Sequence, residues 1–410
     1  MDTKKAQELI NLETKYGAHN YHPLPVVLDR GEGVYVWDVN GKRYYDFLSA
    51  YSAVNQGHCH PRIVDSLVTQ AKRLTLTSRA FYNSRLGEYE EYITRYFGYE
   101  KVLPMNTGAE AVETALKLCR KWAYEKKGLD DNKAQIVVCG NNFHGRTTTI
   151  ISFSSDPEAY NHYGPYTPGF IVIPYNDSGE LEKVLKENKN IAGFLVEPIQ
   201  GEAGVYVPDD GYLRKCFELC KEHNVLFIAD EVQTGIARTG KLLACDYEDV
   251  HPDILILGKA LSGGSYPVSA VLSSTEIMDV IRPGQHGSTF GGNPIAASVA
   301  ITALEVVKDE NLAENAFVLG EIFREKLNEL CSKSRVVSLA RGKGLLNAIV
   351  INNDGSKDLA WDICIELSEN GLLAKPTHTN IIRFAPPLII KEEQLTECIN
   401  IIKETIKSFE

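Results

Sequence analysis

The segments VLFIAD, residues 225–230, and ILILGK, residues 254–259, decide the fold. Each is a short apolar run that ends in a charged side chain, Asp230 in the first and Lys259 in the second. Such runs are typical of buried parallel strands, whose C-terminal ends open onto the ligand crevice of an α/β sheet. A lysine and a carboxylate at two such ends suit pyridoxal phosphate: the lysine can form a Schiff base with its aldehyde, and the carboxylate can keep the pyridine nitrogen protonated. The same two residues could also be ordinary polar ends of strands.

Bulk properties exclude several classes of protein. With 410 residues, the chain is long enough for two or three domains and a large core. A net charge of -11 argues against nucleic acid or an anionic membrane as the main partner, because both require a basic surface. No apolar stretch approaches the roughly 18 residues that a membrane span needs.

The N-terminus and the cysteines predict the compartment. The first residues have neither an apolar signal core nor an Arg-rich, acid-poor character, so no targeting peptide is expected. The nine cysteines are scattered and form no CxxC pair, and Cys216 and Cys220 are expected to be packing residues. We therefore expect a reduced, cytoplasmic protein without disulfides or a zinc site.

The order of patterns along the chain predicts an α/β fold with a second, smaller unit. Residues 1–45 contain an alternating segment at 34–38 and the hairpin signal Asn40-Gly41, and we expect them to pack with the small domain. Residues 46–295 alternate helices with short apolar strands, which indicates a large domain with a mainly parallel sheet covered by helices on both faces. Residues 296–410 combine helical spacing with two apolar runs, at 345–350 and 381–384, and are expected to form a smaller α+β domain.

Two further motifs allow competing interpretations. Thr107-Gly108 precedes a helical pattern, so it could offer free amides to a phosphate or be a plain helix cap. Residues 140–147 fall one residue short of a P-loop and carry Arg146 where that motif needs lysine, so an NTPase is the rival class. Alternatively, Phe143 would cover a flat ring and Arg146 would bind a carboxylate.

Other candidate motifs predict structure only. The Gly-x-Gly fragments at 31–33 and 342–344 neither open a helix after a strand nor have an acid about twenty residues on, so we interpret them as turns. His58 and His60 lack further ligands nearby and are expected to be structural.

Taken together, these motifs make the chain resemble the class III (ω-) aminotransferases, which are fold-type I pyridoxal-phosphate enzymes. The similarity runs over nearly the whole chain, from the segment at 16–23 to that at 382–387. Its most specific motifs are VEPIQGEAG at 196–204, ADEVQTG at 229–235 and LGKALSGG at 257–264. A non-catalytic protein on this scaffold is disfavoured because every chemically required residue is present.

The resemblance implies a role for each matching position. Lys259 would be the Schiff-base lysine and proton shuttle, and Asp230 the partner of the pyridinium nitrogen. The other residues expected around the cofactor are Gly108 and Ala109 (phosphate amides), Phe143 and Val232 (either side of the ring), Gln233 (the ring hydroxyl), and Ser288 and Thr289 (phosphate, from the neighbouring subunit of a homodimer). His144, which follows Phe143, departs from the family pattern and is expected to affect only the packing behind the ring.

The resemblance also implies the substrates, L-ornithine and 2-oxoglutarate, and hence a place in arginine metabolism and proline biosynthesis. Glu202 would pair with Arg383 while ornithine is bound and release it to the carboxylate of 2-oxoglutarate. Arg146 would hold the remote carboxylate, and Tyr21 and Tyr51 would contact the amine end of ornithine. Related activities on acetylornithine or 4-aminobutyrate, or an aminomutase reaction, remain open at this stage.

Overall fold

A seven-stranded sheet forms the centre of the computed structural model, which describes residues 3–352 and 358–410. Within it only β10 runs antiparallel to its neighbours. The strands, in spatial order, are β4 (Lys101–Met105), β10 (Ser269–Ser273), β9 (Ile254–Leu257), β8 (Leu226–Asp230), β7 (Ile191–Val196), β5 (Gln135–Cys139) and β6 (Phe170–Ile173). The mainly parallel sheet predicted from the sequence is confirmed.

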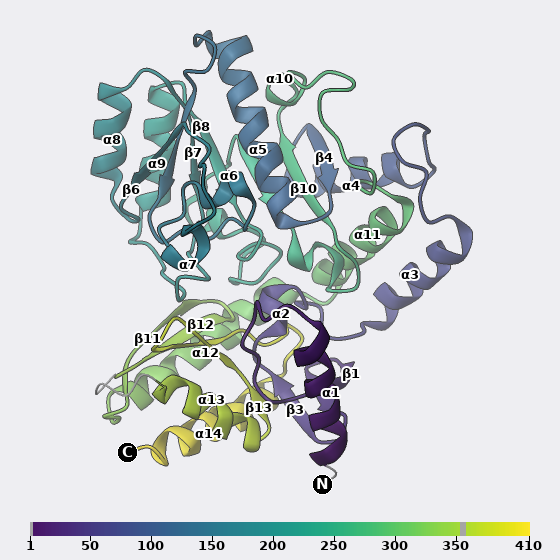
Figure 1. The fold of residues 1–410 in the computed structure, drawn as a ribbon, viewed down its shortest axis with the longest axis vertical. Coiled ribbons are helices and arrows are strands. Elements are labelled where there is room, and N and C mark those ends of the chain that lie inside the picture. The colour runs from purple at the N-terminus through teal and green to yellow at the C-terminus, as the bar shows by residue number, and fades with distance from the viewer. Residues whose placement is uncertain (1–2, 353–357) are drawn as a thin grey trace.

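Helices cover both faces of this sheet, as Figure 1 shows. Because side chains alternate along a strand, Val138 packs into the layer under α5 (Gly108–Trp122), whereas its neighbour Val137 packs into the opposite layer. That opposite layer contains α8 (Ser178–Glu187) and α9 (Tyr212–Glu222). The sheet is therefore buried on both faces, which explains why its strands are continuous apolar runs.

Two smaller sheets lie in the other half of the molecule. One has the order β11 (Val337–Lys343), β12 (Leu346–Ile351), β15 (Ile381–Phe384) and β14 (Lys375–Thr377), with every pair antiparallel. The other has the order β1 (Leu28–Glu32), β2 (Tyr35–Asp38), β3 (Arg43–Asp46) and β13 (Leu372–Leu373). Around them lie α1 (Thr3–Tyr16), α12 (Leu312–Cys331), α13 (Leu359–Glu369) and α14 (Glu392–Lys407).

The N-terminal segment contacts the C-terminal part of the chain. Strand β3 pairs in parallel with β13, and the ring of His22 stacks on Trp361 of α13 with centroids 4.2 Å apart. The predicted hairpin is confirmed, because β2 and β3 pair antiparallel around Asn40-Gly41. These contacts support our proposal that residues 1–45 belong with the smaller unit.

Helix α11 (Pro294–Asp309) crosses the boundary that the sequence suggested between residues 295 and 296. It packs along α3 (Pro61–Arg73) and α4 (Leu86–Phe97) in the half that holds the central sheet. The packing partners change only after Asn311, which has φ +52°, where α12 begins. We therefore propose that the large unit extends to about residue 310.

Several elements had no clear signal in the sequence. They are the antiparallel strand β10 with its partner β4, the short helices α6 (Thr148–Ile151), α7 (Pro157–Tyr160) and α10 (Thr275–Met278), and a left-handed turn, α2 (Ser49–Ser52). A single helical turn carries too little periodicity to be recognised, and so does the partly buried edge strand β4. The turn α2 becomes important below.

Candidate active site

The C-terminal ends of the central strands border a cavity of about 200 Å³. Strand β8 ends at Asp230, β9 is followed by Gly258 and Lys259, and the N-terminus of α5 closes one side. The lining residues are Gly108, Ala109, Phe143, His144, Gly145, Glu197, Ile199, Asp230, Val232, Gln233, Thr234 and Lys259. The structure thus brings together the two strand ends from which the sequence analysis started and five of the other residues expected around the cofactor.

Lys259 opens a 3₁₀ turn (Lys259–Ser262) and is half-buried in the wall of the cavity. Its backbone has φ +45°, a conformation that costs a non-glycine residue free energy and that clusters at functional sites. Burial lowers the pKa of Lys259 to about 8, although the charges of Glu202 and Asp230 oppose that shift. Near neutral pH this amine is therefore uncharged far more often than that of an ordinary lysine, as a nucleophilic lysine requires.

Asp230 is buried and is held from two sides. Its Oδ2 lies 2.6 Å from Nδ1 of His144, and its Oδ1 accepts a hydrogen bond of 3.1 Å from the backbone of Val232. Burial alone would lower the pKa of His144, but the hydrogen bond and charge of Asp230 outweigh it and raise that pKa. The expectation that His144 affects only ring packing is therefore too narrow, because this side chain directly contacts the cofactor-facing carboxylate.

Glu197 is a second cavity residue that the sequence analysis did not single out. It follows β7 directly, just as Asp230 ends β8, so the strand-end rule that identified Asp230 could have found it. Its Oε1 accepts a hydrogen bond of 2.8 Å from the backbone amide of Phe143. Burial raises the pKa of Glu197 to about 7, so it can hold a proton near neutral pH.

At the N-terminus of α5, Thr107-Gly108 provides both a helix cap and free backbone amides, the two features that the sequence analysis treated as alternatives. Thr107 caps the helix by accepting from Glu110 N at 3.2 Å, and the Glu110 carboxylate accepts from Thr107 N at 2.8 Å. This capping box uses the third amide of the helix but leaves those of Gly108 and Ala109 free of any partner within the described part of the chain. Two free amides at a helix N-terminus form a seat for a phosphate.

The seat also has the close packing that a flat ring needs. A Cβ atom added at Gly108 would lie 3.1 Å from a methyl group of Val232, so the backbone passes directly over that side chain. Phe143 and Val232 both line the cavity, and Nε2 of His144 is a buried polar atom without a partner among the described residues. A lysine nucleophile, a carboxylate, a phosphate seat and apolar side chains together fit pyridoxal phosphate.

An ion pair lies beside this cavity. Arg383 Nη1 of β15 is 2.9 Å from Glu202 Oε2 and 3.2 Å from the carbonyl oxygen of Gly201. The Arg383 guanidinium also lies over the ring of Tyr51, 5.1 Å from its centroid, and its Nη1 is 3.4 Å from Gln233 Oε1. Arg383 is almost wholly buried, so an uncompensated charge there would be costly.

Arg146 and Tyr21 lie at the outer side of the site. The guanidinium of Arg146 is 5.7 Å from the ring centroid of Phe143, and it forms no ion pair within the described residues. The pKa of Tyr51 is raised first by burial and then by Glu202, with smaller influences from Tyr21 and Arg146, so all four residues share one electrostatic neighbourhood. Tyr21 itself is 68% exposed.

Among the residues expected around the cofactor, Ser288 and Thr289 are the two that do not line the cavity of their own chain. Ser288 Oγ accepts a hydrogen bond of 2.8 Å from Asn106 Nδ2, and Thr289 is exposed. The exposure of Thr289 is compatible with a role in a neighbouring subunit.

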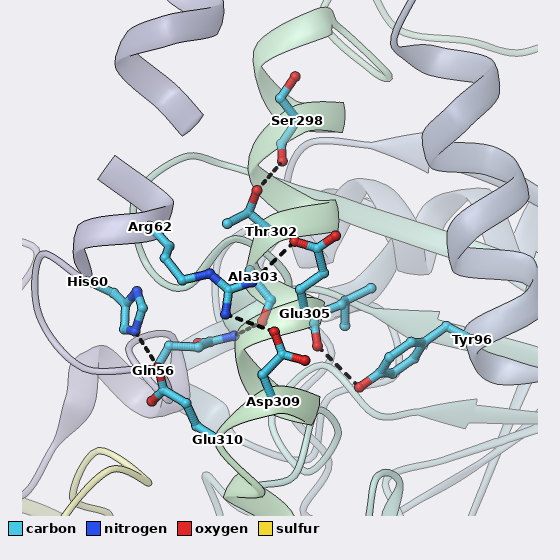
Figure 2. A network of polar contacts seen from close by, with 11 residues as sticks. Gln56, His60, Arg62, Tyr96, Ser298, Thr302, Ala303, Glu305, Asp309 and Glu310 are labelled. Carbon is cyan, nitrogen blue, oxygen red and sulfur yellow. Dashed lines mark hydrogen bonds and ion pairs between the residues drawn. The ribbon is translucent and has the colours of Figure 1, made fainter. Parts of the chain in front are cut away.

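The histidine pair His58 and His60 is structural, as expected. His60 pairs with Glu310 at 2.9 Å, and Arg62 pairs with Asp309, in a polar network between α3 and α11 (Figure 2). His58 contacts Asp46 at 2.7 Å. Among the described residues no cluster of His, Cys, Asp and Glu could hold a metal ion, and all nine cysteines are free thiols, with Cys216 and Cys220 buried.

A lysine that lines the cavity and a buried carboxylate, at adjacent strand ends and facing a phosphate seat, define the fold-type I class of pyridoxal-phosphate-dependent enzymes. Residues 16–406 match the family model described as Aminotransferase class-III. The chain belongs to the class III aminotransferases and is a pyridoxal-phosphate-dependent transaminase.

Curated relatives are similar over nearly their whole length. The mitochondrial ornithine aminotransferase of Drosophila melanogaster is 63% identical, with 97% of this chain and 90% of the relative covered. That of Rattus norvegicus is 59% identical, with 99% and 93% covered.

Solved structures give the same fold with two different names. An ornithine aminotransferase from Toxoplasma gondii, crystallised with partial occupancy of pyridoxal phosphate at its active site, has a TM-score of 0.97 at 49% identity and covers 98% of this chain and 94% of its own. A structure named acetylornithine aminotransferase, from Elizabethkingia anophelis, has a TM-score of 0.91 at 64% identity and covers 98% and 99%. None of the helices in the described part of the chain has the length and apolar character of a membrane span.

Proposed function

We propose that this chain transfers the δ-amino group of L-ornithine to 2-oxoglutarate, giving L-glutamate 5-semialdehyde and L-glutamate. The observation that carries this proposal is the Glu202–Arg383 ion pair of 2.9 Å, whose two charges both act on Lys259. Ornithine presents an uncharged carbon chain next to its reacting amine, whereas 2-oxoglutarate presents a carboxylate there. A site that can neutralise its own arginine accepts the first substrate and, after the pair opens, the second.

The residues of the cavity divide the chemical work. Pyridoxal phosphate, when bound, supplies an aldehyde that takes up the amino group and a ring that accepts electron density from the reacting carbon. Lys259 Nζ carries the proton away from Cδ of ornithine, a task that suits an amine whose pKa is near 8. Asp230 would stabilise the protonated ring nitrogen, Gln233 would contact the ring hydroxyl, Phe143 and Val232 would enclose the ring, and Gly108 and Ala109 would bind the phosphate.

Arg383 is the switch between the two half-reactions. With ornithine bound, Glu202 neutralises it; with 2-oxoglutarate bound, the substrate carboxylate replaces Glu202. Breaking a buried ion pair is costly unless a new partner of the same charge arrives, so the incoming carboxylate itself opens the pair. Glu202 is 32% exposed, which leaves it free to turn toward solvent when displaced.

The far end of the substrate is held by three side chains. Arg146, which forms no ion pair within the described residues, would bind the remote carboxylate in a forked arrangement. Tyr21 and Tyr51 would contact the α-amino end of ornithine. Tyr21 is the residue that distinguishes a free α-amine from an acetylated one.

We further propose a homodimer in which Ser288 and Thr289 reach the phosphate of the neighbouring subunit. The proposal is supported by their position outside the cavity of their own chain and by exposed aromatic residues, Phe81 and Phe290 among them. A reduced, cytoplasmic location and a place in arginine metabolism and proline biosynthesis complete the proposal; the nine free thiols suit any reducing compartment.

The second candidate function is transfer from N-acetylornithine, favoured by the name of the 64% identical structure from Elizabethkingia anophelis. A steady-state assay with 2-oxoglutarate and a panel of donors separates the two. We expect L-ornithine to give a kcat/KM at least tenfold above those of N-acetylornithine and 4-aminobutyrate. A preference for N-acetylornithine would replace the proposed donor.

A further inference from the structure

Four successive non-glycine residues, Ser49 to Ser52, have φ between +47° and +71°. They form a left-handed turn in which Ala50 has φ 47°, ψ 48° and Tyr51 has φ 60°, ψ 44°. L-residues visit this region singly and at a cost, so a run of four persists only where the surroundings hold it. The turn presents Tyr51, whose ring lies against the guanidinium of Arg383.

A single carboxylate holds the start of this turn. Asp46 Oδ1 accepts hydrogen bonds from the backbone amides of Leu48, at 2.8 Å, and Ser49, at 2.9 Å. The other oxygen, Oδ2, lies 2.7 Å from Nε2 of His58. Asp46 is 7% exposed, so both of its oxygens are occupied by partners rather than by bulk water.

The His58 ring is fixed in turn by a glycine motif that the sequence analysis interpreted only as a turn. A Cβ added at Gly31 would lie 2.9 Å from three atoms of His58, so only glycine leaves room for the ring. The backbones of Gly33 and His58 exchange two hydrogen bonds, of 3.0 and 2.8 Å. Gly31, Gly33 and His58 thus form one support under Asp46.

The same support connects to the strand that carries Arg383. Phe47, next to Asp46, accepts a hydrogen bond of 2.7 Å from the amide of Ala385, two residues after Arg383. Asp46 therefore fixes Tyr51 on one side while its neighbour fixes β15 on the other. The distance between the Tyr51 ring and Arg383 depends on this junction.

We infer that Asp46, supported by His58, is a positioning residue that sets Tyr51 against Arg383 and thereby tunes the Glu202–Arg383 switch. The inference rests on the proposed function of that switch. Asp46 touches neither substrate nor cofactor and acts through the left-handed turn. Removing its carboxylate frees two buried amides and lets the turn relax toward ordinary backbone conformations, which moves Tyr51 away from the arginine.

The chain offers a matched control in Asp38. Its Oδ1 also accepts two backbone amides, those of Asn40 and Lys42 at 2.9 Å each, and its Oδ2 accepts from the hydroxyl of Tyr44 at 2.8 Å. That turn joins β2 to β3 and presents no residue to the cavity. Asp38→Ala removes the same kind of support without reaching Tyr51.

The test is a double-mutant cycle in the pyridoxal-phosphate-loaded enzyme. It uses Asp46→Ala, Tyr51→Ala and the double variant, and measures kcat/KM for 2-oxoglutarate together with the thermal midpoint. We expect Asp46→Ala to lower kcat/KM tenfold or more in the natural background but less than twofold in the Tyr51→Ala background. Asp38→Ala should leave kcat/KM within twofold, and Asp46→Asn, which keeps an amide acceptor, should recover most of the loss.

Equal losses in both backgrounds would overturn the inference, since Asp46 would then act independently of Tyr51. If Asp46→Ala does not fold, the same cycle is run with Ala50→Gly present throughout, because glycine adopts left-handed conformations without that cost. The cycle is run with the amino donor that the panel shows to be fastest. If the proposed donor is wrong, only the substrate used in the cycle changes. If the role of Asp46 is wrong, Asp46→Ala has the same effect in the natural and the Tyr51→Ala backgrounds.

Discussion

The amine of Lys259 lines the cavity, and groups of both charge signs surround it. Because burial dominates, its pKa is lowered from 10.5 to about 8. A lowered lysine pKa means that the reactive free amine appears about two pH units earlier than in solution. We predict that the rate at which cofactor-free protein recombines with pyridoxal phosphate rises with pH and is half-maximal near pH 8. Stopped-flow absorbance measures it, and a midpoint above pH 10 would contradict the assignment.

The Glu202–Arg383 pair makes a prediction about selectivity at the same scale. In Glu202→Ala, Arg383 remains buried without a partner and attracts the α-carboxylate of α-amino donors. We predict that the ratio of activity with L-glutamate as donor to activity with L-ornithine rises at least tenfold, about 1.4 kcal/mol. Glu197→Gln is a control, because Glu197 shares the cavity without an ion pair to Arg383. An unaltered ratio of the two activities in Glu202→Ala would contradict the proposed Glu202–Arg383 switch.

Lys259 and Asp230 could be predicted because each ends a conspicuous apolar strand, and a strand end marks the crevice of a parallel sheet. His144 could not be predicted in the same way. Its role depends on a contact with Asp230, 86 positions further along the chain, and nothing in the local sequence around residue 144 reports such a contact. The left-handed conformation of Ser49 to Ser52 could not be predicted either, since Ser, Ala and Tyr have no preference for positive φ.

At the scale of elements, the N-terminus of helix α5 contributes both to the stability of the protein and to the proposed phosphate site. Its capping box leaves the amides of Gly108 and Ala109 for the phosphate. We predict that Thr107→Ala costs about 1 kcal/mol of stability and also weakens cofactor retention, because the first turn frays. Thermal unfolding and the dissociation rate of pyridoxal phosphate measure the two effects.

Asp177→Ala is the matched control for this prediction. Asp177 caps α8 by accepting from Glu180 N at 3.0 Å, and α8 lies away from the cavity. It should cost similar stability with no change in cofactor retention. Equal cofactor loss in both variants would mean that the cap of α5 has no particular link to the phosphate.

The strands that could be predicted are those buried on both faces, such as β8 and β9, where every residue except the terminal Asp230 of β8 is apolar. Strand β10 was missed although its residues are all buried, because Ser269 and Ser273 at its ends interrupt the apolar run. Both serines satisfy their hydroxyls on backbone carbonyls, of Thr107 and Asp253 respectively. A strand whose polar residues form hydrogen bonds inside the fold is therefore missed by a search for apolar runs.

At the scale of the whole molecule, the class of fold could be predicted from the alternation of helices and strands, but the junction between the two halves could not. Helix α11 has the apolar composition of either half, and only its packing along α3 and α4 assigns it. The assembly of two chains likewise depends on surfaces rather than on periodicity.

The proposed homodimer leads to a prediction at this scale. If Thr289 reaches the phosphate of the neighbouring subunit, Thr289→Glu places a negative charge against it and should speed cofactor dissociation at least tenfold, while sedimentation still reports a dimer. Gln285→Glu, an exposed position nearby on the same loop, should leave dissociation unchanged. A monomer that binds the cofactor tightly would contradict the proposal.

The transfer of one particular nitrogen is the central claim, and isotope labelling tests it most directly. L-ornithine labelled with ¹⁵N at the δ position is incubated with the enzyme and 2-oxoglutarate, and the glutamate formed is analysed by mass spectrometry. We predict that the label appears in glutamate with δ-labelled ornithine and is absent from it with α-labelled ornithine. Glutamate that carries the α-label, or no label from either form, would contradict the account.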